Sequence, residues 1–184
     1  MPDGPALAKP NVRLYGQVDD AMFHDFARKL GDVPDGERVV LELMTFGGDA
    51  DVARRIALEI RLAGELQGRE FFFLGKTVVY SAGVTVMAAV PRANRHQTRD
   101  TVLLIHSRRM EKQLQLNGSL SSSIQAVRET LSELETGLRL EREGFVELTA
   151  GSDIAEEEIL RRAETGWYLT AAEAMSRGLI AGIL

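Results

Sequence analysis

The chain has 184 residues, 45% of them apolar and 27% charged, which is the composition of a soluble globular protein with a single domain. Its 22 basic and 27 acidic residues give a net charge of −5, which argues against nucleic acid as the main partner, because phosphate binding requires a basic surplus. The absence of cysteine excludes disulfides, thiolate metal ligands and a cysteine nucleophile. We predict no metal site and no cofactor.

The longest apolar run, residues 77–90, has 14 residues, whereas a membrane span needs roughly 20. We therefore predict no membrane partner and a cytoplasmic location. Residues 1–10 contain three prolines and a glycine and are predicted to form a flexible tail. Residues 11–184 are predicted to form one domain.

The first half of this domain alternates strands and helices. Asp19 and Asp20 are predicted to begin a helix that runs to about Lys29, and a second helix is predicted over about residues 50–66. "VTVMAAV" after Ser81 predicts a short buried helix, and the charged segment "PRANRHQTRD" predicts a solvated loop. The predicted strands are "NVRLYG", "RVVLELMT", "REFFFLG" and "DTVLLIH". This order is typical of an α/β domain whose sheet is largely covered.

The second half begins with one long helical pattern over about residues 119–149. Its apolar residues recur at spacings of three and four, interrupted once at Glu141; they are Ile124, Val127, Leu131, Leu134, Leu138, Phe145 and Leu148. A helix of this length is a rod of roughly 45 Å. It packs either along its own domain or against another subunit, and we favour the second. A helix over about residues 154–163 follows, then a turn at "YLT", a short helix from Ala171, a stop at Gly178 and a final apolar strand.

Only three histidines are available for general base chemistry. His24 lies in the first predicted helix and His96 in the charged loop, and both are expected to be ordinary surface histidines. His106 ends a buried strand and precedes the charged segment "SRR". A ring at this position is either a hydrogen-bonded core histidine or a general base that faces a cleft.

Ser81 is a single hydroxyl within an apolar run, and it is either a hydrogen-bonded core serine or a nucleophile. A hydroxyl needs a base to remove its proton, and it gains from a helix N-terminus whose free N–H groups can hold an oxyanion. The small residues Ala82 and Gly83 follow Ser81 and would let a substrate approach the backbone. The pair Gly47–Gly48 follows a buried strand and could be a turn, a phosphate loop or a second arm of an oxyanion hole.

Taken in order, these segments resemble the ClpP family, the proteolytic subunits of the Clp protease. The resemblance covers about residues 11–184, and the separation of 25 residues between Ser81 and His106 matches the family. The resembling segments are "VRLYGQVDD", "LELMTFGGDADVARRIALEIR", with Phe46 where a proline is usual, "YSAG", "LLIHSRR" and "YLTAAEAMSRGLIAGIL".

The resemblance implies a ClpP/crotonase-like β-β-α superhelix with a long handle helix through which rings of subunits meet. It implies that Ser81 is the nucleophile and His106 its base, with their side chains in hydrogen-bonding reach or nearly so. It further implies that the backbone N–H groups of Gly48 and Ala82 bind the oxyanion. The expected partners are a peptide substrate and further copies of the chain, in rings or another homo-oligomer.

Three features depart from the family pattern. The position of the third triad residue, an aspartate in the family, is Gly166, and Glu164 lies two residues earlier. We favour a slow Ser–His dyad over a triad completed by Glu164. Only about ten residues precede the first core strand, so an ATPase unfoldase partner is not favoured. Arg108 and Arg109 stand where substrate strands would pair.

The leading hypothesis is a serine endopeptidase of the ClpP-like class that acts on peptides or unfolded chains. A non-catalytic ClpP-like structural subunit is the alternative that the missing aspartate favours. A crotonase-type acyl-CoA enzyme is a third hypothesis, but it does not require a Ser–His pair.

Overall fold

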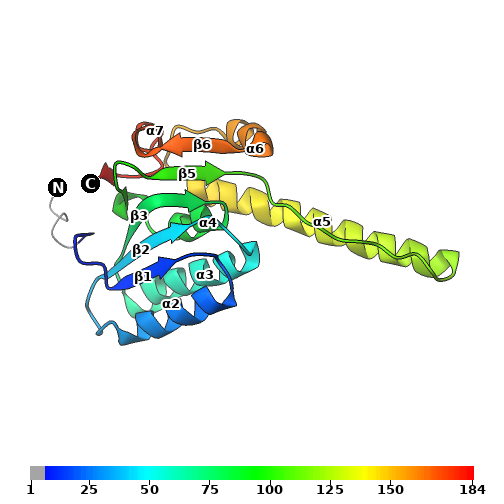
Figure 1. Cartoon of the computed structure of the whole chain (residues 1–184), viewed down its shortest axis with the longest axis horizontal. Coiled ribbons are helices and arrows are strands. Elements are labelled where there is room, and N and C mark those ends of the chain that lie inside the picture. The colour runs from blue at the N-terminus through cyan, green and yellow to red at the C-terminus, as the bar shows by residue number, and fades with distance from the viewer. Residues whose placement is uncertain (1–6) are drawn as a thin grey trace.

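The structure, a computed structural model, describes residues 7–184 and contains one seven-stranded sheet with helices packed against it (Figure 1). The strands are β1 (Val12–Tyr15), β2 (Val39–Thr45), β3 (Phe71–Tyr80), β4 (Arg95–Gln97), β5 (Val102–Ile105), β6 (Trp167–Thr170) and β7 (Gly182–Ile183). The helices are α2 (Asp20–Asp32), α3 (Ala50–Gln67), α4 (Ala82–Ala88), α5 (Leu120–Thr149), α6 (Glu156–Thr165) and α7 (Ala171–Ser176), with a 3-10 turn at Arg92–Asn94. The predicted α/β class is confirmed.

The sheet branches at β3. Strands β1, β2, β3, β4 and β7 are parallel neighbours in that order, and a second branch runs from β3 to the parallel strand β5 and the antiparallel strand β6. The first half of β3 pairs with β4 and the second half with β5. Between the halves the pairing with β2 shifts at Lys76 and Thr77, and Thr77 has a φ of 58°. The branch places the ends of β3 and β5 side by side.

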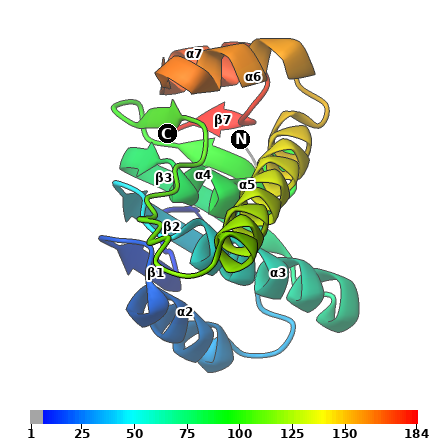
Figure 2. The same cartoon turned by 90° about the vertical axis from the view of Figure 1, so that its right-hand side faces the viewer.

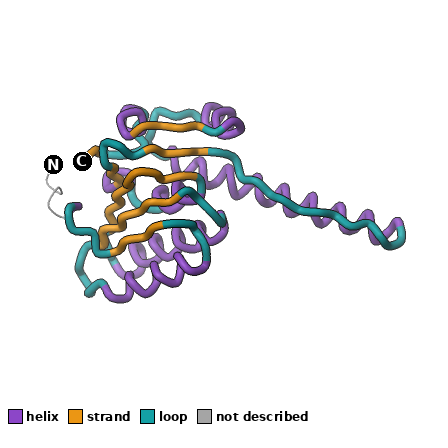
Figure 3. The backbone as a smooth tube through the Cα atoms, in the orientation of Figure 1, coloured by secondary structure: helices purple, strands orange, loops and turns teal. Residues whose placement is uncertain are grey.

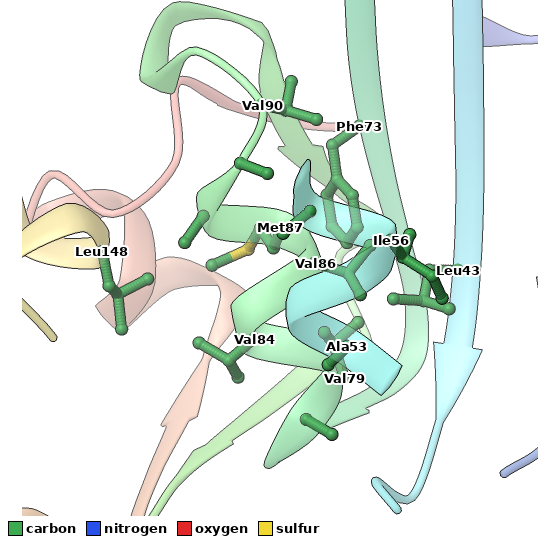
Figure 4. Packing of buried hydrophobic residues seen from close by; sticks show 14 of the residues in the cluster. Leu43, Ala53, Ile56, Phe73, Val79, Val84, Val86, Met87, Val90 and Leu148 are labelled. Carbon is green, nitrogen blue, oxygen red and sulfur yellow. The ribbon is translucent and has the colours of Figure 1, made fainter. Parts of the chain in front are cut away.

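The main core lies between the sheet and the helices α2, α3 and α4, which are seen beside the strands in Figure 2. Figure 4 shows how this core joins elements from across the chain. The labelled buried side chains are Leu43, Ala53, Ile56, Phe73, Val79, Val84, Val86, Met87, Val90 and Leu148.

Three of the predicted helix starts are confirmed by their capping residues. The Asp19 side chain accepts a hydrogen bond from Met22 N at the start of α2. Asp49 does the same for the first residues of α3, and Ser119 for α5. Each cap satisfies an N–H group that has no partner within the helix. Because this interaction is local, the start of the helix can be predicted from the sequence. The next helix, predicted to begin at Ile154, begins instead at Glu156, and its N-cap Ala155 forms no side-chain cap.

The predicted solvated loop at residues 91–100 is wrong. Its centre is strand β4, where Arg95, His96 and Gln97 are all buried. The Arg95 guanidinium is accommodated because it donates to the carbonyl groups of Ala88, Val90 and Leu148, at 2.7 to 3.1 Å. Ala88 and Leu148 lie at the C-terminal ends of α4 and α5, and Val90 lies two residues after α4. Burial lowers the pKa of Arg95 to about 10.

Two further segments differ from the sequence prediction. The predicted turn at "YLT" is part of strand β6, which pairs with β5. Of the predicted tail, residues 1–6 lie outside the described residues, whereas the Leu7 side chain is only 1% exposed and packs with Val40 and Phe72. The extent of the tail and the single domain over residues 11–184 otherwise remain predictions.

The predicted long helix is confirmed as α5, and most of it projects from the rest of the molecule (Figure 1). The tube in Figure 3 shows the loop that precedes α5 running back along the helix. Phe145 and Leu148 at its C-terminal end are buried, whereas Ile124, Leu131 and Leu138 are more than half exposed. Within residues 7–184, no helix combines the length and apolarity needed to cross a membrane.

Candidate active site

Ser81 occupies a strained turn between β3 and α4. Its φ of 52° and ψ of −115° lie in a region that residues with a side chain rarely adopt, and such a conformation costs on the order of 1–3 kcal/mol. Ser81 N donates to Leu104 O at 2.8 Å, which ties the turn to the end of β5. A strained strand–turn–helix of this kind exposes a nucleophilic hydroxyl in hydrolases of other folds. The side chain forms no cap with its helix.

The small residues beside Ser81 are required by close packing. A Cβ atom on Gly83 would lie 2.3 Å from Thr45 Cγ2, so only glycine lets α4 approach β2. A Cβ atom on Gly47 would lie 2.9 Å from Ser81 Cβ. Gly47 therefore lies directly against Ser81.

Gly48 and Ala82, which are predicted to bind the oxyanion, line the same cleft as Ser81. The Gly48 loop is held in place by hydrogen bonds from Val18 N to Gly47 O at 2.9 Å and from Asp49 N to Val18 O at 2.8 Å. Neither the Gly48 nor the Ala82 N–H is among the hydrogen-bond donors recorded for residues 7–184. Paired free amides next to a hydroxyl are the parts of an oxyanion hole.

His106 follows β5 and lines the same cleft as Ser81. Its ring Nδ1 lies 2.7 Å from the carbonyl oxygen of Ser107. A carbonyl only accepts hydrogen bonds, so Nδ1 carries a proton and a neutral ring has its lone pair on Nε2. This is the tautomer that a general base in a serine protease uses. The predicted hydrogen bond between Ser81 and His106 is not formed in the structure, although both residues face one cleft.

No carboxylate within residues 7–184 forms an ion pair with His106. Gly166 ends α6 with a φ of 83°. Glu164, the predicted alternative, lies in the last turn of α6 with its residue exposed to solvent and has no recorded hydrogen bond. The segment after His106 is instead fixed by Ser107 N, which donates to Ala163 O at 3.0 Å. A dyad without Glu164 stays our prediction.

The cleft has a volume of about 1390 Å³ and lies between the N-terminal part of α3, the Ser81 turn, the segment after His106 and α5. Arg108 crosses part of it and pairs with Asp51 at 2.9 Å. The Arg108 hydrogen bond holds the pKa of Asp51 below its ordinary value. Arg109 also lines the cleft, with its side chain exposed. An extended peptide would therefore meet charged groups of both signs and apolar side chains of α5.

Two contributors to the site were not predicted as such. The sequence indicates Gly47 only as part of a Gly-Gly pair, whereas the structure shows that it makes the close approach to Ser81. The sequence indicates Glu141 only as an interruption of the apolar stripe, whereas its carboxylate accepts a hydrogen bond from the backbone N–H of Arg108. The interruption was the available signal.

Comparison with known proteins identifies the fold. No protein-family model matches this sequence, and no curated protein sequence matches it. A solved structure of a ClpP1 mutant from Listeria monocytogenes matches with a TM-score of 0.74, over 100% of this chain and 96% of that chain, at 18% sequence identity. The fold is ClpP-like. The resemblance predicted from the sequence is thus confirmed at the level of the fold.

Proposed function

We propose that this chain is a serine peptidase of the ClpP-like class that hydrolyses peptide bonds in peptides or unfolded chains through an acyl-enzyme. The observation that carries the proposal is the backbone strain at Ser81, because a serine is held at a φ of 52° in the same cleft as Gly48, Ala82 and His106. Backbone strain of this kind clusters at active sites.

The mechanism follows from the groups on the cleft wall. The Ser81 hydroxyl oxygen attacks the carbonyl carbon of the substrate while His106 Nε2 accepts the hydroxyl proton. The resulting oxyanion is bound by the N–H groups of Gly48 and Ala82. The intermediate collapses, the amine leaves with the proton from His106, and water then releases the acid from Ser81 by the same steps.

A non-catalytic structural subunit is the second candidate, and the absence of a carboxylate partner for His106 favours it. A crotonase-type acyl-CoA enzyme has less support, because such an enzyme has no need of a strained serine paired with a histidine. For either of the first two candidates we propose self-association into rings or another homo-oligomer. The exposed apolar stripe of α5 supports this proposal.

A fluorophosphonate probe separates a peptidase from a structural subunit, because it reacts with activated serines. We expect the folded wild-type protein to be labelled and to cleave a fluorogenic peptide, and Ser81→Ala to do neither. Ser176→Ala, a surface serine on α7, should be labelled like the wild type. An unlabelled wild type that is folded would overturn the peptidase in favour of the structural subunit.

A further inference from the structure

The peptide group between Ser107 and Arg108 is engaged at both of its polar ends. Its carbonyl accepts the hydrogen bond from His106 Nδ1 at 2.7 Å. Its N–H, which belongs to Arg108, donates to the carboxylate of Glu141 on α5. One planar peptide group thus joins the imidazole ring to a carboxylate that does not touch the ring.

We propose that Glu141 supplies the negative charge that the missing triad aspartate would provide, acting on His106 through this peptide group. The inference rests on the proposed peptidase function. A charge-assisted hydrogen bond to the N–H polarises the peptide, and hydrogen bonds in a chain strengthen one another. The Ser107 carbonyl therefore becomes a stronger acceptor for Nδ1–H, which orients the ring and stabilises the imidazolium.

No proton passes along this chain of bonds. His106 Nε2 takes the proton of Ser81 and returns it to the leaving amine, while Nδ1 keeps its own proton throughout. Glu141 remains a carboxylate and the peptide group remains an amide. Glu141 touches neither the substrate nor the ring, so it is a positioning residue.

The position of Glu141 in α5 supports a dedicated role. It lies three residues after Leu138 and four before Phe145. This spacing places it on the apolar stripe, where an apolar side chain is expected. Glu141 is half-buried, and its partner is a backbone N–H of the segment that carries His106. Glu164, the alternative acid, is exposed and forms no hydrogen bond with His106 or Ser107.

Neighbouring charges are engaged elsewhere. The Arg108 side chain pairs with Asp51 of α3, and Arg61 of α3 pairs with Glu147. Lys112 of the loop pairs with Glu133 of α5. The other charged residues that line the cleft are Asp49, which is the N-cap of α3, Arg54 of α3, Arg109 of the loop, and Arg128, Glu129 and Glu143 of α5. The Arg108 N–H is the one backbone donor that Glu141 binds.

The tautomer of His106 tests the inference without any turnover. Nitrogen-15 NMR in alkaline buffer, where histidine rings are neutral, distinguishes Nδ1–H from Nε2–H, and loss of a signal in His106→Gln assigns the ring. We expect chiefly Nδ1–H, although free histidine prefers Nε2–H. Glu141→Gln keeps an oxygen for the Arg108 N–H but removes the charge, and it should shift the ratio about threefold toward Nε2–H.

Glu133→Gln is the matched control, because its carboxylate also ties α5 to the loop but binds the Lys112 side chain. It should leave the tautomer ratio of His106 unchanged. A wild-type ring that is chiefly Nε2–H would overturn the inference, as would equal ratios in Glu141→Gln and the wild type. Both results are readable even if the protein proves to be inactive, in which case only the proposed function fails.

Peptide hydrolysis gives the second readout. Glu141→Gln should lower kcat by about tenfold to a hundredfold with little change in KM, less than the roughly 10⁴ lost when a directly bonded triad carboxylate is neutralised. Glu133→Gln and Glu164→Gln should retain wild-type kcat within about twofold. A hundredfold loss in Glu164→Gln alone would instead make Glu164 the acid. If Glu141→Gln misfolds, Glu141→Leu fits the apolar stripe and should fold but lose kcat to the same extent.

Discussion

At the scale of single residues, two non-glycine residues among those described have a positive φ, and both belong to the β3 region. Thr77 lies at the irregularity where the sheet branches, and Ser81 lies at the turn into α4. A β-branched residue with a φ of 58° is unusual, and so is a serine with a φ of 52°. Thr77 thus lies where the sheet branches, and Ser81 holds its hydroxyl at the turn into α4.

The strain at Ser81 predicts a trade-off between stability and activity. Ser81→Gly should raise the free energy of unfolding by about 1 kcal/mol, because glycine relieves the strain at a smaller cost in unfolded-state entropy. Ser81→Ala keeps a Cβ atom and should not be stabilised. Both variants should be inactive. Denaturant unfolding measures the difference.

Thr77→Gly is the matched control for this prediction, because it removes a positive-φ side chain that is exposed and outside the cleft. It should be stabilised while the fluorophosphonate labelling of Ser81 is retained. A Ser81→Gly variant less stable than Ser81→Ala would show that no strain is stored at this turn.

At the scale of elements, α6, β6 and α7 are joined by one cluster of charged side chains. Arg177 donates to Glu158 at 2.7 and 3.1 Å and to Asp153 at 2.8 Å, and Arg162 donates to Glu158 at 2.9 Å. Both arginines lie over the Trp167 ring, 4.7 and 5.5 Å from its centroid. Because Trp167 pairs with Ile105, this cluster supports the strand that leads to His106.

The cluster predicts a pH dependence of stability. Hydrogen bonds from Arg177 lower the pKa of Glu158 from its ordinary 4.5 to about 2. Because the folded-state pKa lies below the unfolded one, the contribution of Glu158 is fully present above pH 4.5 and is lost as the pH falls toward about 2. Glu158→Gln should therefore lose less stability than the wild type between these pH values, as measured by urea unfolding.

Glu157→Gln provides the control, because Glu157 is the exposed neighbour on the same turn and has no recorded hydrogen bond. Its stability should follow the wild-type dependence on pH. If Glu158→Gln also followed the wild-type curve, the pairing with Arg177 would contribute nothing to the folded state.

At the scale of the whole molecule, the projecting part of α5 carries an apolar stripe that the single chain covers only in part. Leu131 and Leu134 are 52% and 44% exposed on the same stripe as Ile124, Val127 and Leu138. Exposed apolar side chains that recur on one helix face are typical of a contact between subunits.

We predict that the wild type is a homo-oligomer and that Leu131→Glu with Leu134→Glu dissociates it without unfolding the domain. Placing charges within a buried subunit contact is costly, whereas the same charges on a monomer remain solvated. Light scattering measures the mass and circular dichroism the fold. Leu66→Glu, which changes a residue 77% exposed at the end of α3, should leave the mass unchanged. A wild type that is monomeric at micromolar concentration would contradict this prediction.

Features that depend on neighbours along the chain can be predicted from the sequence. Asp19 and Ser119 mark helix starts because a cap acts within one turn, and the bounds of α5 followed from its own apolar period. Gly48, Ser81 and His106 each follow a buried strand, and the ends of adjacent parallel strands meet at one edge of a sheet. Their arrival in one cleft was therefore predictable.

The tertiary structure alone decided what depends on partners far away in sequence. The sequence does not predict strand β4, because the charge of Arg95 is satisfied only by carbonyls of α4 and α5. It does not predict strand β6, because the pairing partner of β6 is β5. The positive φ of Ser81 arises where β3 turns into α4 and packs against β2 and β5. No local sequence pattern predicts this φ. Glu141 and Arg108 are 33 residues apart, so only the packing of α5 against the segment after His106 brings a carboxylate to the peptide group that holds the ring.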